Sequence, residues 1–175
     1  MKLPNNIDIH THTGPIRPDA VLCIDPTQCD ELPAGNGLLS VGIHPWNAGN
    51  ATTEVWRRMA LWLNDPRVIA VGEIGLDRIR GPKLDEQISV FQRQMQMACS
   101  LEMPIIIHCV RAYDVLLGLG GGMNVQRVVH GFRGKPELAR QLLAAGFDLS
   151  FGRHYNEEAY AITPDDRRYR ETDTL

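Results

Sequence analysis

The sequence lacks any long hydrophobic run. Its first ten residues, MKLPNNIDIH, contain no apolar core of signal-peptide length, and no window approaches the roughly 18 apolar residues of a membrane span. The formal net charge of -3 gives no general attraction to nucleic acid or to anionic membranes. These absences predict a cytoplasmic protein with no membrane partner, in which any phosphate binding is local.

Cysteine is scarce. The four cysteines form no C-x-x-C pair and are too few to staple a secreted fold. They fit a reducing compartment, where we interpret them as ordinary small residues: Cys23, Cys29, Cys99 and Cys109.

Short apolar runs rich in Val and Ile recur along the 175 residues, whose composition is 43% hydrophobic and 22% charged. Runs of this kind, without strict alternation, are typical of strands buried on both faces of a parallel sheet. We therefore expect one soluble domain over residues 1–175. With NIDIH first and RYRETD (168–173) last, the candidate strands between them are 20–24, 38–43, 68–72, 104–109, 125–130 and 147–151.

Three intervening segments have helical periodicity. Residues 84–101 place an apolar stripe on one face, with glutamines and charges expected on the other. Residues 53–63 repeat the pattern, with Thr52 or Thr53 as the cap, and a third helix lies between Pro136 and Gly146. The apolar positions are Leu84, Ile88, Phe91, Met95 and Ala98 in the first helix, and Val55, Met59 and Trp62 in the second.

Alternating strands and helices leave two architectures, a doubly wound sheet or a (β/α)8 barrel. Eight candidate strands favour the barrel, although a typical barrel needs about 250 residues. No helix is expected between the first two strands or in residues 26–37, where Pro and Gly dominate. We also expect no helix after the last strand, so the prediction is a reduced TIM-like α/β barrel that lacks some outer helices.

Polar residues follow the strands at their carboxyl ends, where barrel enzymes build their active sites. His10 and His12 share one strand face because they are two residues apart. Singly, each histidine has the alternative of a hydrogen-bonded core residue. Together, the nitrogen and oxygen donors suit two divalent cations such as Zn, Mn or Mg. The predicted ligands are His10, His12, Glu73, His108, His130 and Asp173.

An ordered set of motifs now resembles a known family: DIHTHTG, VGIHPW, VGEIGLD, PIIIHC, VVHGFRGK, LSFG and ETD. In this order they are similar to the TatD-like metal-dependent hydrolases of the amidohydrolase superfamily, often called TatD DNases. The resemblance implies a two-metal barrel that hydrolyses phosphodiester bonds of DNA, commonly as an exonuclease.

Carried over by motif, the ligands divide between the two metals. His10 and His12 would hold one metal, His108 and His130 the other, and Glu73 would bridge both. Asp173 would bind the first metal and orient or deprotonate the attacking water, which makes Glu73 and Asp173 the predicted catalytic residues.

Basic residues in the loops after the fourth to seventh strands are candidates for binding substrate phosphates. Solvated loops also collect charge without such a role. We favour Arg111 and Arg133, because each closely follows a proposed ligand. His44 either contacts phosphate or ties down its own loop. The basic loop residues are Arg78, Arg80, Lys83, Arg111, Arg133, Lys135 and Arg153.

Two features depart from the family pattern. The fifth-strand motif usually has its arginine two residues after the histidine, whereas Arg111 follows His108 by three. Arg168 and Arg170 occupy positions that are apolar in relatives. Outward-facing arginines fit a barrel wall without a covering helix. This wall would be covered by self-association in a homo-oligomer, or the sequence is part of a longer protein.

Other functions stay open. PHP-type phosphoesterases also begin with a DIHTHT-like strand, although GEIGLD and VVHGFRGK fit TatD better. Amide or lactone hydrolysis would use the same metal chemistry. A relative that binds metal or nucleic acid without turnover is a further alternative, because a fold does not prove an activity.

Overall fold

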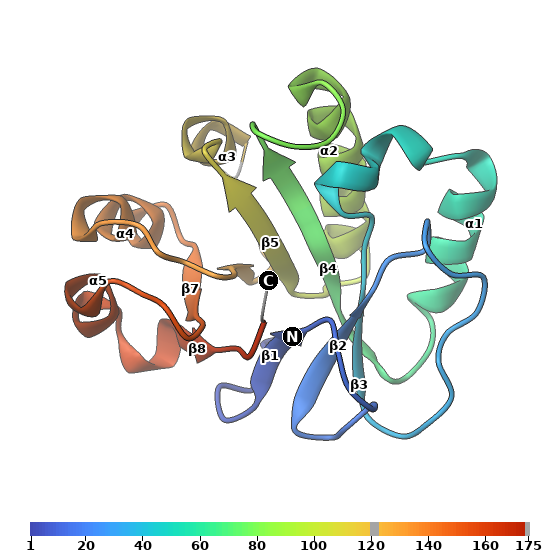
Figure 1. Cartoon of the computed structure of the whole chain (residues 1–175), viewed down its shortest axis with the longest axis horizontal. Coiled ribbons are helices and arrows are strands. Elements are labelled where there is room, and N and C mark those ends of the chain that lie inside the picture. Colours follow the sequence, from blue (N-terminus) through green and yellow to red (C-terminus); the bar gives the residue numbers. More distant parts are fainter. Residues whose placement is uncertain (120–122, 174–175) are drawn as a thin grey trace.

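Eight parallel strands close into a barrel in the order of the chain (Figure 1). This computed structural model describes residues 1–119 and 123–173. The prediction of a reduced TIM-like barrel is thereby confirmed. The strands are β1 (Asp8–Thr11), β2 (Ala20–Ile24), β3 (Leu38–Val41), β4 (Val68–Asp77), β5 (Ile105–Val110), β6 (Arg127–Val129), β7 (Asp148–Phe151) and β8 (Arg168–Arg170).

Helices cover only part of the barrel. Within the described ranges, none lies between β1 and β2 or between β2 and β3, as the sequence predicts. The three expected helices are present. Thr52 caps the helix that begins at Thr53 by accepting a hydrogen bond from Val55 N–H. The helices are η1 (Pro45–Asn50), α1 (Thr53–Trp62), α2 (Leu84–Ser100), α3 (Tyr113–Leu119), α4 (Pro136–Ala144), α5 (Glu157–Ile162) and η2 (Asp165–Arg167).

Two of these helices, α3 and α5, were not predicted. They have 7 and 6 residues, too short to display a full helical repeat of apolar positions. The start of α5 is fixed by Asn156, whose side chain accepts from Ala159 N–H at 2.9 Å. None of the helices in the described ranges combines the length and apolar composition needed to cross a membrane.

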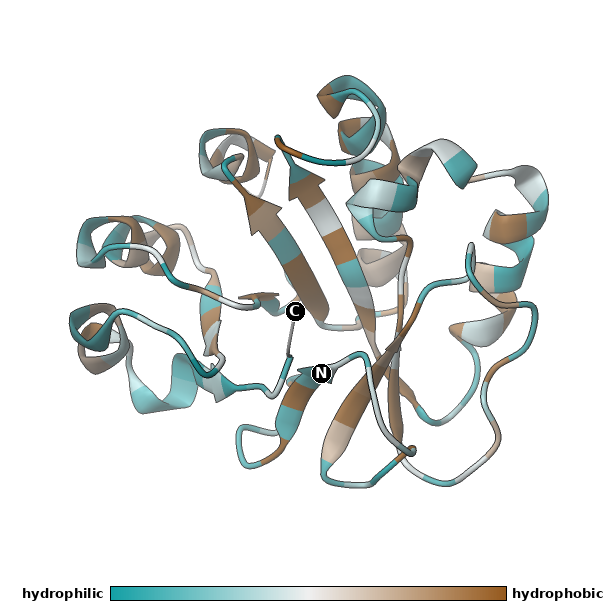
Figure 2. Cartoon of the chain, viewed as in Figure 1, coloured by the Kyte–Doolittle hydropathy of each residue, from teal (hydrophilic) through white to brown (hydrophobic). Residues whose placement is uncertain are grey.

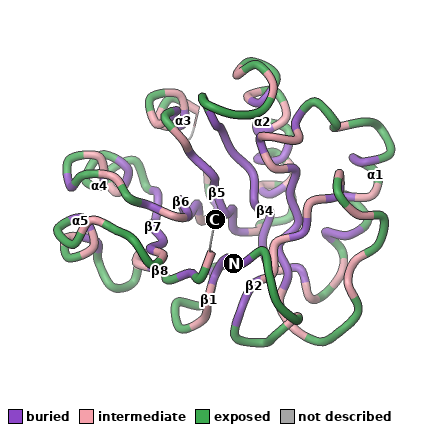
Figure 3. Tube along the Cα trace, viewed as in Figure 1, coloured by how far each residue is buried: buried purple, intermediate pink, exposed green. Residues whose placement is uncertain are grey.

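The strands consist largely of apolar residues (Figure 2), and most of their length is buried (Figure 3). One cluster fills the space between the sheet and the helices, and a smaller one joins residues of six strands, which only the barrel interior allows. Residues two positions further along a strand point the same way. The interior residues Ile106, Val128 and Tyr169 therefore place His108, His130 and Glu171 at the carboxyl end of the barrel. The interior strand residues are Ile9, Val21, Ala70, Ile106, Val128 and Tyr169.

The prediction that the glutamines of α2 face solvent is wrong for Gln87 and Gln94, which are 1% and 0% exposed. Each pairs its amide with backbone at a strand end. Gln94 accepts from Ile43 N–H (2.7 Å) and donates to Ile43 O (3.1 Å). Gln87 accepts from Asp77 N–H (2.7 Å) and donates to Asp77 O (2.9 Å). These bonds satisfy buried backbone groups and fix the two loops that leave the barrel at its carboxyl end.

The two unusual arginines lie on the outside of β8. Tyr169 between them is 1% exposed inside the barrel. Arg168 donates to the carbonyls of Tyr160 and Thr163, both at 3.0 Å, so the segment from α5 covers it partly. Arg170 is exposed and donates to the Tyr160 hydroxyl at 3.2 Å. The expected contact with water therefore holds for Arg170, whereas Arg168 is held by protein groups.

Candidate metal centre

Glu73 lies at the middle of the candidate site. The register of β4 against β5 shifts between Val71 and Ile74, the kind of irregularity that re-aims a side chain. The Glu73 carboxylate is 1% exposed, and its backbone N–H donates to Cys23 Sγ at 3.0 Å. A carboxylate this deeply buried requires cationic or hydrogen-bonding partners.

The first carboxylate oxygen, Oε1, faces three imidazoles. It lies 2.6 Å from His130 Nε2, 2.7 Å from His108 Nδ1 and 3.3 Å from His44 Nε2. His108 Nδ1 and His130 Nε2 are themselves 3.4 Å apart. Strands β5 and β6 thus bring two predicted ligands to the same oxygen.

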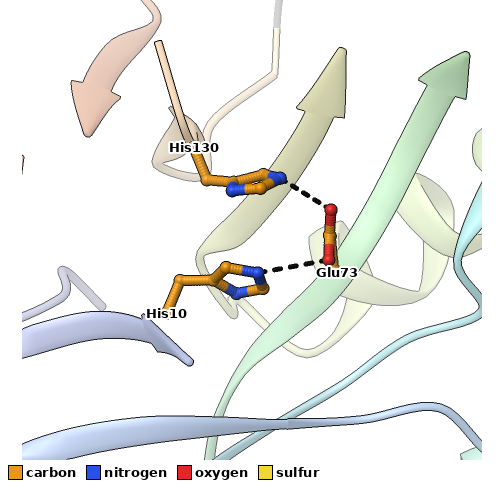
Figure 4. Close-up of side chains that lie close together, drawn as sticks. All are labelled: His10, Glu73 and His130. Carbon is orange, nitrogen blue, oxygen red and sulfur yellow. Dashed lines mark ion pairs between the residues drawn. The ribbon is translucent and has the colours of Figure 1, made fainter. Parts of the chain in front are cut away.

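The second oxygen, Oε2, faces the opposite pair of histidines. It lies 3.2 Å from His10 Nε2 and 2.9 Å from His12 Nε2. Figure 4 shows His10 and His130 approaching Glu73 from separate elements, each directed at a different oxygen. The two oxygens therefore divide the four predicted histidine ligands into the pairs expected from the sequence.

Buried donor atoms around His10 test whether this cluster fits a metal. His10 is 0% exposed; its Nδ1 has no hydrogen-bond partner within the described residues, and its Nε2 has only the 3.2 Å contact with Glu73 Oε2. Glu171 Oε2 is also buried without a hydrogen-bond partner among the described residues. Buried polar atoms are rarely left without partners, and imidazole and carboxylate donors are typical metal ligands. The residues therefore fit divalent cations.

Asp173 lies where it can serve both sides of the cluster. Ligand atoms of His10, His12 and Asp173 lie within 4.8 Å of one another, and so do those of His130, Glu171 and Asp173. Asp173 is half-buried, whereas Glu171 is 7% exposed. The chain thus brings all six predicted ligands together.

Charge interactions within the cluster are strong. Burial by itself raises the pKa of Glu73, but the imidazoles of His130 and His10 outweigh burial and hold that pKa well below its usual range. Burial lowers the pKa of His130, but Glu73 and Glu171 raise it well above its usual range. The cluster therefore favours ionised carboxylates and a protonated His130, and a bound cation would replace such protons.

The two ring nitrogens of His44 have different contacts, one within its own loop and one toward Glu73. Its Nδ1 accepts from Trp46 N–H at 3.2 Å and caps η1, which ties down the loop. Its Nε2 faces Glu73, and His44, Glu73 and His108 form a further group with ligand spacing. His44 therefore fixes its loop and also belongs to the candidate site.

Arg111 and Arg133 lie on the rim of a cavity above the cluster. Both are exposed and line a volume of about 830 Å³ together with His108, His130 and Asp173. Arg111 adopts a left-handed backbone conformation with φ 51°, and its carbonyl accepts from Arg78 at 2.8 Å. Arg111 follows His108 by three residues, one more than the family pattern, but the left-handed conformation at Arg111 turns the chain so that Arg111 still lines the cavity.

Comparison with known proteins shows the family. The sequence model described as TatD related DNase matches residues 30–174. This chain belongs to the TatD-related DNase family. The match includes Glu73, His108, His130 and Asp173, whereas His10 and His12 precede it.

Individual relatives agree with the family. The chain is 31% identical over 146 residues to a protein of Cronobacter turicensis named 3'-5' ssDNA/RNA exonuclease TatD, covering 77% of this chain and 56% of that one. It is 33% identical over 146 residues to the uncharacterized metal-dependent hydrolase YabD of Bacillus subtilis, covering 77% and 57%. This TatD-family chain thus spans little more than half the length of these relatives.

A solved structure shows the same fold. The TatD homolog YJJV of Escherichia coli superimposes with a TM-score of 0.69 at 21% identity, over 85% of this chain and 64% of that one. At this identity the similarity is evidence for the barrel alone.

The TatD-family site has an orienting carboxylate that sequence reasoning missed. Asp77 Oδ2 accepts from Trp46 Nε1 at 2.6 Å and lies 3.2 Å from His108 Nε2. Its Oδ1 accepts from Ile79 and Arg80 N–H at 2.8 and 3.0 Å. Asp77 thus fixes the His108 ring with Nδ1 toward Glu73, as carboxylates behind metal-binding histidines do.

We expect Asp77→Asn to weaken metal binding about 10- to 100-fold, because its amide would place N–H groups against the N–H of Trp46 and of His108. Isothermal titration with Zn²⁺ or Mn²⁺ measures the change. Trp46→Phe is the matched control, since it removes one donor and leaves the Asp77–His108 contact. Equal affinities for Asp77→Asn and the wild type would contradict the orienting role.

Signals for the missed residues were present in the sequence. Asp77 ends the GEIGLD segment, four residues after Glu73, and Glu171 precedes Asp173 by two residues and so faces the same way in an extended chain. Glu171 Oε1 lies 3.4 Å from His130 Nδ1. Cys23 was interpreted as an ordinary small residue, but it joins His12 and Glu73 in a group with ligand spacing.

Proposed function

We propose that this TatD-family chain is a metal-dependent phosphodiesterase that removes nucleotides from the 3′ end of single-stranded nucleic acid. The observation that carries the proposal is the division of histidines around Glu73, with His10 and His12 at one oxygen and His108 and His130 at the other. The substrate is inferred from the name of the Cronobacter relative, and the resemblance of the motifs to the same family implies DNA.

The donor set supports two divalent cations. His10, His12 and Asp173 would hold one, His108 and His130 the other, and Glu73 would contact both. Imidazole-rich sites suit Zn²⁺ better than Mg²⁺. When bound, two such cations polarise the phosphoryl oxygens and lower the pKa of an attacking water.

The chain's own residues would position the substrate and accept a proton. Asp173 is half-buried beside both histidine groups, so its carboxylate can accept a proton from water at the open side of the cluster. Arg111 and Arg133 on the cavity rim would hold phosphate oxygens, and His44 Nε2 would contact the phosphate nearest Glu73. Glu73 would keep the two cations at a fixed separation.

We expect 5′-labelled single-stranded DNA to be shortened stepwise from its 3′ end in the presence of Mn²⁺. Chelation of the metal should abolish this reaction, and added Mn²⁺ should restore it. Gel analysis of the products measures the effect, and the same strand with a blocked 3′ end is the control.

Two outcomes would contradict the proposal. A folded protein with bound metal that degrades neither DNA nor RNA would remove the nuclease function. Small phosphomonoesters hydrolysed much faster than DNA would favour a PHP-like phosphoesterase.

A further inference from the structure

A second cavity begins at the metal centre and extends along the outside of the barrel. Its volume is about 1040 Å³. Gly152, Glu171 and Asp173 line both this cavity and the one above the metal cluster, so the two adjoin at these residues. We call it the β8–β1 groove, and its other lining residues include Arg153, Tyr155, Tyr160, Arg168, Arg170 and Thr172.

The groove follows the junction of β8 and β1 on the outside of the barrel. Strands β8 and β1 pair through a single register position, Asp8 with Arg170. Asp8 also accepts from Thr172 N–H at 3.1 Å and from the Thr172 hydroxyl. Helix α5 precedes β8 in the chain (Figure 1), and its Tyr160 lines one side of the groove, while Asn5, Asn6, Ile7 and Asp8 line the side of β1.

Aromatic rings form a stack in the groove. The Arg168 guanidinium lies 4.3 Å from the centroid of the Tyr160 ring. The Tyr160 and Tyr155 rings are 4.9 Å apart and inclined by 30°. Tyr155 is 43% exposed and is the one exposed aromatic residue in the described ranges. Its ring offers a flat surface on which a nucleic-acid base can stack.

Charged side chains of both signs line the groove. Glu171 and Asp173 lie at the end shared with the metal cavity, and the remaining charges are Arg153, Arg168 and Arg170 against Asp8 and Asp165. Asp165 is paired with Arg168, and Asp8 is engaged by Thr172. Within the described chain, neither Arg153 nor Arg170 forms an ion pair with a carboxylate. Both arginines are exposed and line the groove, where Arg170 donates to the Tyr160 hydroxyl at 3.2 Å, and both guanidinium groups can bind phosphate oxygens.

We infer that the β8–β1 groove binds the uncleaved part of a single-stranded nucleic acid, on the 5′ side of the bond that reaches the metal centre. Unpaired bases are required because only they expose their faces to Tyr155. The inference rests on the proposed function, since the metal centre then fixes which end of the strand enters the cavity. It adds a binding surface outside that cavity.

The binding test uses the whole chain in a chelating buffer, with fluorescence anisotropy of 5′-labelled dodecathymidylate. Tyr155→Ser should weaken binding about tenfold, and Tyr155→Phe should restore it because the ring remains. Arg153→Gln combined with Arg170→Gln should lower the slope of log K against log salt concentration by about 1.4, or about 0.7 for each phosphate that is no longer neutralised. Arg57→Gln with Arg140→Gln is the matched control, because both arginines are exposed and lie outside the groove.

The activity test separates the groove from the metal centre. Tyr155→Ser should leave hydrolysis of bis(p-nitrophenyl) phosphate within twofold of the wild type, because this small ester does not extend into the groove. The same variant should raise KM for dodecathymidylate about tenfold and change KM for dithymidylate little.

The outcomes distinguish the two proposals. Oligonucleotide binding that depends on Tyr155 supports the groove even if no ester is hydrolysed. Normal oligonucleotide binding and KM in Tyr155→Ser overturn the groove even if hydrolysis is efficient. A change in oligomeric state on light scattering without a change in binding also overturns it, because the surface then serves self-association.

Discussion

Glu73→Gln is expected to reduce metal-dependent hydrolysis about 10³-fold. The substitution preserves shape but removes the charge that five imidazoles face. Metal ions contribute several kcal/mol of transition-state stabilisation, and each 1.36 kcal/mol corresponds to a factor of ten in rate. An amide also cannot accept from both histidine groups, because one of its two ends carries only N–H donors.

The measurement is kcat/KM for a small phosphodiester, recorded together with the metal content of the protein by mass spectrometry. We expect the variant to bind less metal, because Glu73 contributes an oxygen to each histidine pair. Glu54→Gln is the matched control, since this exposed carboxylate lies on α1 and contacts only Arg57 among the described charges. Full activity in Glu73→Gln with a normal metal content would contradict the central role of Glu73.

The sequence predicts which residues gather around Glu73, because the strand ends are marked by polar residues in otherwise apolar runs. The runs have no strict alternation, so the direction of each side chain follows only once the structure shows Ile106 and Val128 inside the barrel, two residues before His108 and His130. Closure of the barrel then brings distant strands together, which explains why residues 10, 73 and 130 meet (Figure 4).

Local pattern does not predict the groups that support the ligands. Gln87 and Gln94 are polar, so helical periodicity placed them on the solvent face of α2, yet each is buried against a strand end. Such a position depends on which backbone groups lack partners after the barrel closes. Asp77 was missed for a similar reason, because its role depends on the approach of Trp46 from η1 and of His108 from β5.

The short helices and the groove show a further limit of sequence patterns. Helix α5 has 6 residues and no full repeat, so its position under Arg168 could not be predicted. Arg168 and Arg170 were identified as outward-facing, and the structure confirms that they flank the buried Tyr169. Their alignment with Tyr155 and Tyr160 depends on the path of the β7–β8 connection. Self-association of this wall stays a prediction.

Gly75→Ala is expected to destabilise the fold by about 3 kcal/mol, near the upper end of the usual cost of overpacking. Gly75 has φ +153°, which L side chains rarely adopt, and a Cβ built there would lie 1.9 Å from His108 O. Gly75 and His108 are register partners in the β4–β5 pair, so the added methyl group meets backbone that cannot rotate away. For a chain of this size, such a loss corresponds to a decrease in Tm of about 6–12 °C.

Gly118→Ala is the matched control for this experiment. Gly118 lies in α3, where a Cβ would meet nothing within 4 Å. Alanine there should stabilise the protein by about 0.5–1 kcal/mol, because glycine loses more conformational entropy in a helix. Thermal unfolding followed by circular dichroism measures both variants, and an unchanged Tm for Gly75→Ala would contradict the close approach of the two strands.

Metal affinity shows whether the glycine also matters for the site. Strand β5 would have to move away from β4 at His108, the residue that Asp77 and Glu73 hold between them. We therefore expect a folded fraction of Gly75→Ala to bind Zn²⁺ or Mn²⁺ more weakly than the wild type, whereas Gly118→Ala should bind normally. The second glycine of GEIGLD would then serve the metal centre through the spacing of two strands, without contacting a ligand side chain itself.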